Sequence, residues 1–275
     1  MRIIITGAGG QVGTILQQTF ADHDLVLFDL PDFDMTKPSA VQEIEAINPD
    51  LILHTAAMTN VDACAQNPSL AYMVNGFGTQ NIALGAMKTN AAMVHISTNE
   101  VFDGTATTPY HEYALTNPIN PYAESKRAAE EIARQLVQKL YIVRIAWAFA
   151  PGGNNFPSKI IKAANKFGKL KVVTDEVSSP TYAPDLAEAL SKLVQTEHYG
   201  IYHLTNEGIC SRYDFAVEIL RQAHKEHIPV EPITSEGYDR PSTPPKYAPI
   251  KNNLAATLGI QLRPWQEALE EYFRA

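Results

Sequence analysis

The stretch ITGAGGQVG, residues 5–13, lies between an apolar run over 2–6 and a helical pattern over 11–20. Its glycines at 7, 10 and 13 have the spacing of a dinucleotide-binding loop. In such a loop the backbone turns tightly, and a pyrophosphate can approach the amides at the helix N-terminus. We therefore predict that Gly7, Gly10 and Gly13 belong to a nicotinamide dinucleotide site.

Short apolar runs alternate with helical patterns through the first half of the chain. Strands that are apolar on both faces are typical of a parallel sheet covered by helices on both sides. We expect strands over 25–28, 51–53, 93–96 and 141–145, and helices over 40–47, 70–87 and 125–139. The predicted fold class is α/β, with a Rossmann-type doubly wound parallel sheet and a smaller C-terminal substrate-binding lobe.

The pattern becomes less regular in the second half. We expect helices over 157–166, 185–194, 213–224 and 264–273, and a strand over 171–173. The segment 228–249 is rich in proline and should lack long regular elements. We divide the chain into a dinucleotide-binding domain, residues 1–149, and a substrate-binding lobe, residues 150–275. Part of 170–205 is expected to pack back on the first domain.

Composition narrows the function classes. The 275 residues carry a net charge of −8 without a Lys/Arg block, which argues against nucleic acid and membrane surfaces as partners. No apolar run approaches the roughly 20 residues of a membrane helix, and residues 1–6 read as a strand rather than an export signal. We therefore expect a cytoplasmic protein with Cys64 and Cys210 as free thiols. The histidines show no metal-binding spacing, so no metal site is predicted.

Asp29 directly follows the second expected strand, at 25–28. A carboxylate at that place can accept hydrogen bonds from the adenosine ribose of a dinucleotide. It would also repel a 2′-phosphate, so the cofactor is expected to be NADH or NADPH with a preference for NADH. Asp34 is either a second contact on the adenine side or part of a surface pair with Asp32.

Tyr122, Lys126 and Thr98 form the candidate catalytic group. On a helix, Tyr122 and Lys126 share one face, since they are four positions apart. A phenol can donate a proton, and a neighbouring ammonium is expected to lower its pKa and make it a better acid. Thr98 ends the strand at 93–96 on the edge where ligands bind, so its hydroxyl can bond a substrate carbonyl.

Several segments together resemble the extended short-chain dehydrogenase/reductase family. They are the glycine loop and residues 54–62, 95–104, 120–126, 144–149, 153–156 and 179–181. The resemblance covers nearly the whole chain. It implies NAD(P)H-dependent reduction of a nucleotide-linked 4-keto-6-deoxysugar, with Tyr122 as proton donor, and it allows a homodimer.

The resemblance also implies roles for individual residues. The catalytic residues would be Thr98, Tyr122 and Lys126. The cofactor contacts would be Gly7, Gly10, Gln11, Val12, Gly13, Asp29, Asp34, Met35, Ala56, Ala57, Met58, Thr59, Tyr122 and Lys126. The substrate contacts would be Thr98, Asn99 and Trp147.

Two departures leave the substrate open. The reductases of this family usually have the sequence Ser-Thr-Asp-Tyr-Val-Phe, and this chain has Asn99 and Glu100 at the positions of the Asp and the Tyr. The second departure is the segment 240–250, which also differs from the family pattern. One alternative function is a related nucleotide-sugar epimerase, and a second is a dehydratase with Glu100 as base, although Asn99 cannot supply the acid that dehydration needs. Another is a cofactor-binding regulatory subunit without catalysis.

Overall fold

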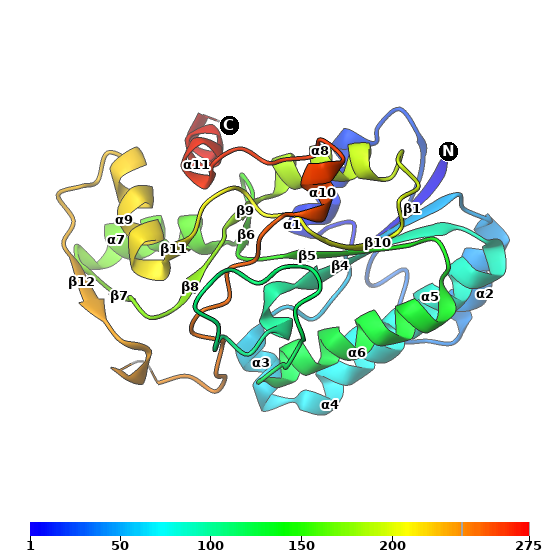
Figure 1. Ribbon diagram of the computed structural model, residues 1–275, viewed down its shortest axis with the longest axis horizontal. Coiled ribbons are helices and arrows are strands. Elements are labelled where there is room, and N and C mark those ends of the chain that lie inside the picture. The colour runs from blue at the N-terminus through cyan, green and yellow to red at the C-terminus, as the bar shows by residue number, and fades with distance from the viewer. Residues whose placement is uncertain (238, 275) are drawn as a thin grey trace.

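The computed structural model describes residues 1–237 and 239–274, and a six-stranded parallel sheet forms its centre (Figure 1). The strands are β1 (Arg2–Thr6), β2 (Asp24–Phe28), β3 (Leu51–His54), β4 (Ala92–Thr98), β5 (Leu140–Ile145) and β10 (Gly200–His203). Their order is β2-β1-β3-β4-β5-β10. The order reverses between β1 and β3, which is where open parallel sheets bind ligands. The predicted fold class is confirmed.

Helices cover both faces of this sheet, as Figure 1 shows. On one face lie α1 (Gln11–Thr19), α8 (Ala183–Leu193) and α10 (Leu254–Thr257), and on the other lie α2 (Ser39–Ile47), α5 (Thr79–Thr89) and α6 (Pro121–Leu136). Side chains alternate along β1, so Ile3 and Ile5 enter the first apolar core and Ile4 the second. All three are fully buried, which explains why the strands read as continuous apolar runs.

The small lobe packs around a separate aromatic core. Its helices are α7 (Phe156–Phe167), α9 (Arg212–Gln222) and α11 (Trp265–Arg274). Its paired strands are β7 (Leu170–Val173) with β12 (Val230–Ile233), β6 (Ala148–Phe149) with β9 (Thr181–Tyr182), and β8 (Val177–Ser178) with β11 (Cys210–Ser211). Phe215 is fully buried in this core, where Phe149 and Trp265 meet it edge-on. Within the proline-rich segment 228–249, the described residues form the four-residue strand β12 and a 3-10 turn, η3 (Ser235–Gly237).

The two predicted helices near the site differ from the observed ones. The catalytic helix α6 begins at Pro121, not at 125, because Asn120 Oδ1 accepts from the Ala123 amide at 2.9 Å and Pro121 fits the first helical position. Tyr122 therefore lies in the first turn of α6. The helix expected over 70–87 is a run of α4 (Pro68–Ala71), a π-helical segment η1 (Tyr72–Gly78) and α5.

Several elements were not expected from the sequence; those beside the site and the central sheet include α3 (Val61–Gln66), η2 (Asn99–Val101) and strand β10. In the described part of the chain, no helix is long and apolar enough to cross a membrane. Over the same residues, no group of three or more His, Cys, Asp and Glu side chains is placed to hold a metal ion. Cys64 and Cys210 are buried and free, as predicted.

Candidate active site

A cleft of about 580 Å³ opens at the carboxyl edge of the sheet. Residues at or just beyond the ends of β1 to β5 line it, as expected for ligand sites in such folds. Most of the predicted site residues meet here: Gly7, Gly10, Gln11, Val12, Asp29, Asp34, Met35, Ala56, Ala57, Thr59, Thr98, Asn99, Tyr122, Lys126 and Trp147. Gly13 and Met58 are not among the lining residues.

The glycine loop is shaped by contacts that leave no room for side chains. Gly7 has a φ of 67°, and a Cβ there would lie 2.8 Å from the backbone of Ala56. A Cβ on Gly13 would lie 2.2 Å from the Gly7 carbonyl oxygen. Gly13 thus lets α1 pack closely against the end of β1 rather than facing the cleft.

Asp29 fixes the same loop from the end of β2. Its Oδ2 accepts from the Gly9 amide at 2.6 Å, and its Oδ1 accepts from the Leu30 amide at 2.9 Å. The carboxylate is exposed and lines the cleft. Each oxygen keeps a second lone pair, so the side chain can still accept from a ribose hydroxyl.

An aromatic pair closes the cleft beyond Asp29. Phe28 and Phe33 stack at 3.8 Å with their planes 8° apart, and both line the cleft. Asp34 also lines this end of the cleft, where its carboxylate accepts from the hydroxyl and amide of Thr36, and these bonds lower its pKa. Phe33 was not predicted, because an aromatic residue in a loop carries no motif.

Met58 supports the catalytic helix through its backbone. Its amide donates to Asn75 Oδ1 at 2.8 Å, and Asn75 Nδ2 donates to Ser125 Oγ at 2.9 Å. Asn75 is fully buried on η1. The chain from Met58 to Ser125 ties the loop after β3 to the turn of α6 that carries Tyr122.

Lys126 reaches under the cleft from α6. Its Nζ donates to the Ile96 carbonyl at 2.7 Å and lies 3.4 Å from His95 Nε2. Burial lowers the pKa of Lys126 to about 8, although the charge of Glu130 acts in the opposite direction. The ammonium is therefore close to titration near neutral pH.

Tyr122 has a raised pKa rather than the lowered one predicted from sequence. Burial of the phenol raises the pKa first, and the negative charge of Glu100 raises it further, while the Thr98 hydroxyl acts in the opposite direction. The prediction is wrong because burial dominates, and Lys126, whose Nζ bonds the Ile96 carbonyl, is not among the groups that shift the pKa of Tyr122. Tyr122 thus holds its proton firmly until a basic oxygen forms beside it.

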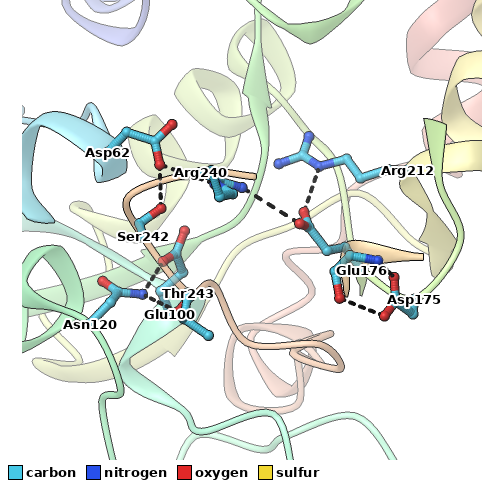
Figure 2. Close-up of polar contacts among 10 residues, drawn as sticks. Asp62, Glu100, Asn120, Asp175, Glu176, Arg212, Arg240, Ser242 and Thr243 are labelled. Carbon is cyan, nitrogen blue, oxygen red and sulfur yellow. Dashed lines mark hydrogen bonds and ion pairs between the residues drawn. The ribbon is translucent and has the colours of Figure 1, made fainter. Parts of the chain in front are cut away.

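Glu100 brings a carboxylate to the same cleft. It follows Thr98 on η2, and its Oε2 accepts from Asn120 Nδ2 at 2.9 Å (Figure 2). Burial raises its pKa, and Asn120, Arg212 and Arg240 lower it. Because Asn120 caps α6, Glu100 also helps to fix the helix start that presents Tyr122.

Asn99 and Trp147 occupy different settings in the cleft wall. The Asn99 amide donates to Ser178 Oγ at 3.1 Å and to the Ala248 carbonyl at 2.9 Å, which ties β4 to the small lobe. Trp147 has a φ of 45°, and the guanidinium of Arg212 stacks on its ring. Arg212 itself lines the cleft and was missed, because only the folded chain brings α9 to this place.

The site fits a dinucleotide on three grounds. The glycine loop lets a ligand approach the first turn of α1, the Asp29 carboxylate can accept from a ribose, and Phe33 offers an apolar wall at the same end. At the other end stand the hydroxyl groups of Thr98 and Tyr122 and the ammonium of Lys126. This arrangement can bind a dinucleotide and supply a proton to a carbonyl oxygen next to it.

Comparisons with known proteins agree with this geometry. The family model described as RmlD substrate binding domain matches residues 1–275. The spore coat polysaccharide biosynthesis protein SpsK of Bacillus subtilis is 36% identical over 99% of this chain and 97% of its own length.

Two solved structures of dTDP-4-dehydrorhamnose reductases are similar over nearly the whole chain. One, from Clostridium acetobutylicum, has a TM-score of 0.96 and 37% identity, and the match covers 100% of this chain and 99% of that one. The other, from Bacillus anthracis in complex with NADP, has a TM-score of 0.96 and 36% identity, with 99% and 98% covered.

Proposed function

The chain belongs to the RmlD substrate binding domain family, and on that basis we propose that it reduces dTDP-4-dehydrorhamnose to dTDP-L-rhamnose with NADH or NADPH. The observation that carries the proposal is the meeting of Thr98, Tyr122 and Lys126 with the glycine loop in one cleft. Those residues are the groups needed to reduce a ketone, and the two solved structures named above are of dTDP-4-dehydrorhamnose reductases.

The proposed mechanism assigns one task to each residue. A bound reduced nicotinamide supplies the hydride to the ketone carbon. Tyr122 donates its phenolic proton to the ketone oxygen as negative charge develops there, and the Thr98 hydroxyl donates a hydrogen bond to the same oxygen. Lys126 places an ammonium near the resulting phenolate and stabilises it. The raised pKa of Tyr122 keeps the proton in place until this step.

The substrate assay tests the proposal directly. We expect the purified protein to oxidise NADH or NADPH when dTDP-4-dehydrorhamnose is added, and to form dTDP-L-rhamnose in equal amount. Related nucleotide-linked keto sugars serve as comparisons, because Asn99 and Glu100 differ from the usual pair at the substrate side. Interconversion of sugars without net cofactor oxidation would favour the epimerase alternative. No reaction with any sugar would favour a regulatory subunit.

We propose a preference for NADH, supported by the exposed carboxylate of Asp29 at the ribose end of the cleft. A 2′-phosphate would face this negative charge. The variant Asp29→Asn keeps a side-chain oxygen that can accept from the Gly9 amide. We expect it to lower the ratio of kcat/KM with NADH to kcat/KM with NADPH by roughly tenfold, equivalent to about 1.4 kcal/mol. Thr36→Val, which alters the same region without changing charge, is the control. An unchanged ratio in Asp29→Asn would remove Asp29 as the selecting residue.

The homodimer and the cytoplasmic location expected from the sequence stay predictions. The nucleotide-sugar substrate follows from the family, and the cleft provides polar groups for it in Thr98, Glu100 and Arg212.

A further inference from the structure

One guanidinium in the cleft wall has no hydrogen-bond partner among the described residues. Arg212 is the first residue of α9, and its guanidinium lies 3.7 Å from the ring centroid of Trp147 and 4.8 Å from that of Phe156. Stacking uses the flat faces of the guanidinium and leaves its N–H groups free around the edge. The nearest carboxylate is that of Glu176, with 3.7 Å between Arg212 Nε and Oε2.

The other cations of this region are already held. Arg240 Nε donates to Asp62 Oδ1 at 3.0 Å, and Figure 2 shows this pair to the left of Glu176. Lys126 donates to the Ile96 carbonyl. Among the described residues, Lys126 and Arg212 are the cations that line the cleft. Lys126 already donates to a carbonyl, so Arg212 is the one whose N–H groups can donate to a ligand.

Glu176 compensates the charge of Arg212 without binding it tightly. Its carboxylate lies between two guanidiniums, 3.7 Å from Arg212 Nε and 3.5 Å from Arg240 Nη1 (Figure 2). Both contacts are longer than ordinary charged hydrogen bonds. The Arg212 donors can thus turn to another acceptor without breaking a short bond, while Glu176 keeps Arg240 as its partner.

We infer that Arg212 binds the diphosphate of the nucleotide-linked sugar, an inference that rests on the proposed function. In such a substrate the sugar ring separates the keto group from the diphosphate. With the ketone at Tyr122 and Thr98, the diphosphate lies one ring further along the cleft. Arg212 lines that cleft from the small lobe. Its guanidinium is close enough to Glu100, two residues after Thr98, for the two charges to interact. A guanidinium that meets a phosphate edge-on can donate two parallel hydrogen bonds, one to each of two phosphate oxygens.

Binding of dTDP and of thymidine to the same variants tests this inference. We expect Arg212→Gln to bind dTDP roughly ten- to hundredfold more weakly than the parent protein, as for loss of charged hydrogen bonds. Thymidine lacks the diphosphate, so its affinity should not change. Arg212→Lys keeps the charge but not the fork, and should recover part of the dTDP affinity. Calorimetric titration gives all these affinities without turnover.

Two controls separate a binding role from a structural one. Arg221→Gln changes an exposed arginine on the same helix, paired with Glu218, and should bind dTDP as the parent does. NADH affinity should stay the same in every variant, because its diphosphate belongs to the glycine loop. Unchanged dTDP affinity in Arg212→Gln, or equal losses for dTDP and thymidine, would overturn the inference.

The outcome is separable from that of the proposed function. If the parent protein reduces dTDP-4-dehydrorhamnose and Arg212→Gln binds dTDP normally, the function stands and the role of Arg212 is rejected. If the variant loses dTDP affinity but the parent turns over no keto sugar, the role of Arg212 stands and the proposed reaction is rejected.

Discussion

Tyr122→Phe is expected to lower kcat by roughly 10²- to 10⁴-fold, the usual contribution of a positioned general acid. The substitution removes one oxygen from a buried side chain and keeps the ring that packs with Cys64 and Ala71. The fold and the cofactor site should therefore persist. Without the phenol, the remaining donors beside the ketone oxygen are the Thr98 hydroxyl and Lys126, and water must supply the proton.

The measurement is single-turnover oxidation of NADH with saturating substrate, together with the affinity for NADH. Tyr72→Phe is the matched control, because this phenol is partly exposed on η1, lies outside the cleft and bonds Glu124 at 3.4 Å. It should react at the parent rate. A parent-like rate in Tyr122→Phe would show that another group donates the proton, and a large loss of NADH affinity would mean that the phenol holds the cofactor instead.

The parts of the site that could be predicted from sequence are those set by local spacing. Gly7 and Gly10 lie in a loop whose shape follows from a strand, a turn and a helix in succession. Tyr122 and Lys126 lie one helical turn apart, so any helix over them puts both on one face. Gly13 has the spacing of the same loop, and its place under the Gly7 carbonyl makes it the glycine that lets the helix pack closely.

The parts that could not be predicted depend on chain segments far apart in sequence. Arg212 enters the site, with Glu176 beside it, only because the small lobe folds against the sheet domain, and neither residue belongs to a motif. Strand β10 has no strong apolar pattern of its own and is defined by its pairing with β5. The pKa of Tyr122 was predicted in the wrong direction, because the residues that bury the phenol cannot be read from the spacing of Tyr122 and Lys126.

A buried ion pair lies beneath the site, between Glu130 on α6 and Arg144 on β5. Arg144 Nε and Nη2 donate to the two carboxylate oxygens at 2.9 and 2.7 Å, and Ser97 Oγ of β4 donates to the same carboxylate at 2.6 Å. The two charged side chains are 3% and 1% exposed. This network joins the catalytic helix to the strand that ends in Thr98.

Arg144→Met is expected to lower the free energy of unfolding by about 3–5 kcal/mol, since it leaves the Glu130 carboxylate buried without its partner. The double variant Glu130→Leu/Arg144→Met removes both charges and should be more stable than the single variant. Lys171→Met breaks an exposed pair with Glu231, 61% and 57% exposed, and should cost about 0–1 kcal/mol. Urea unfolding measures all three. If Arg144→Met costs no more than Lys171→Met, the buried pair does not hold α6 to the sheet, and the placement of Tyr122 must depend on Asn75 and the Asn120 cap instead.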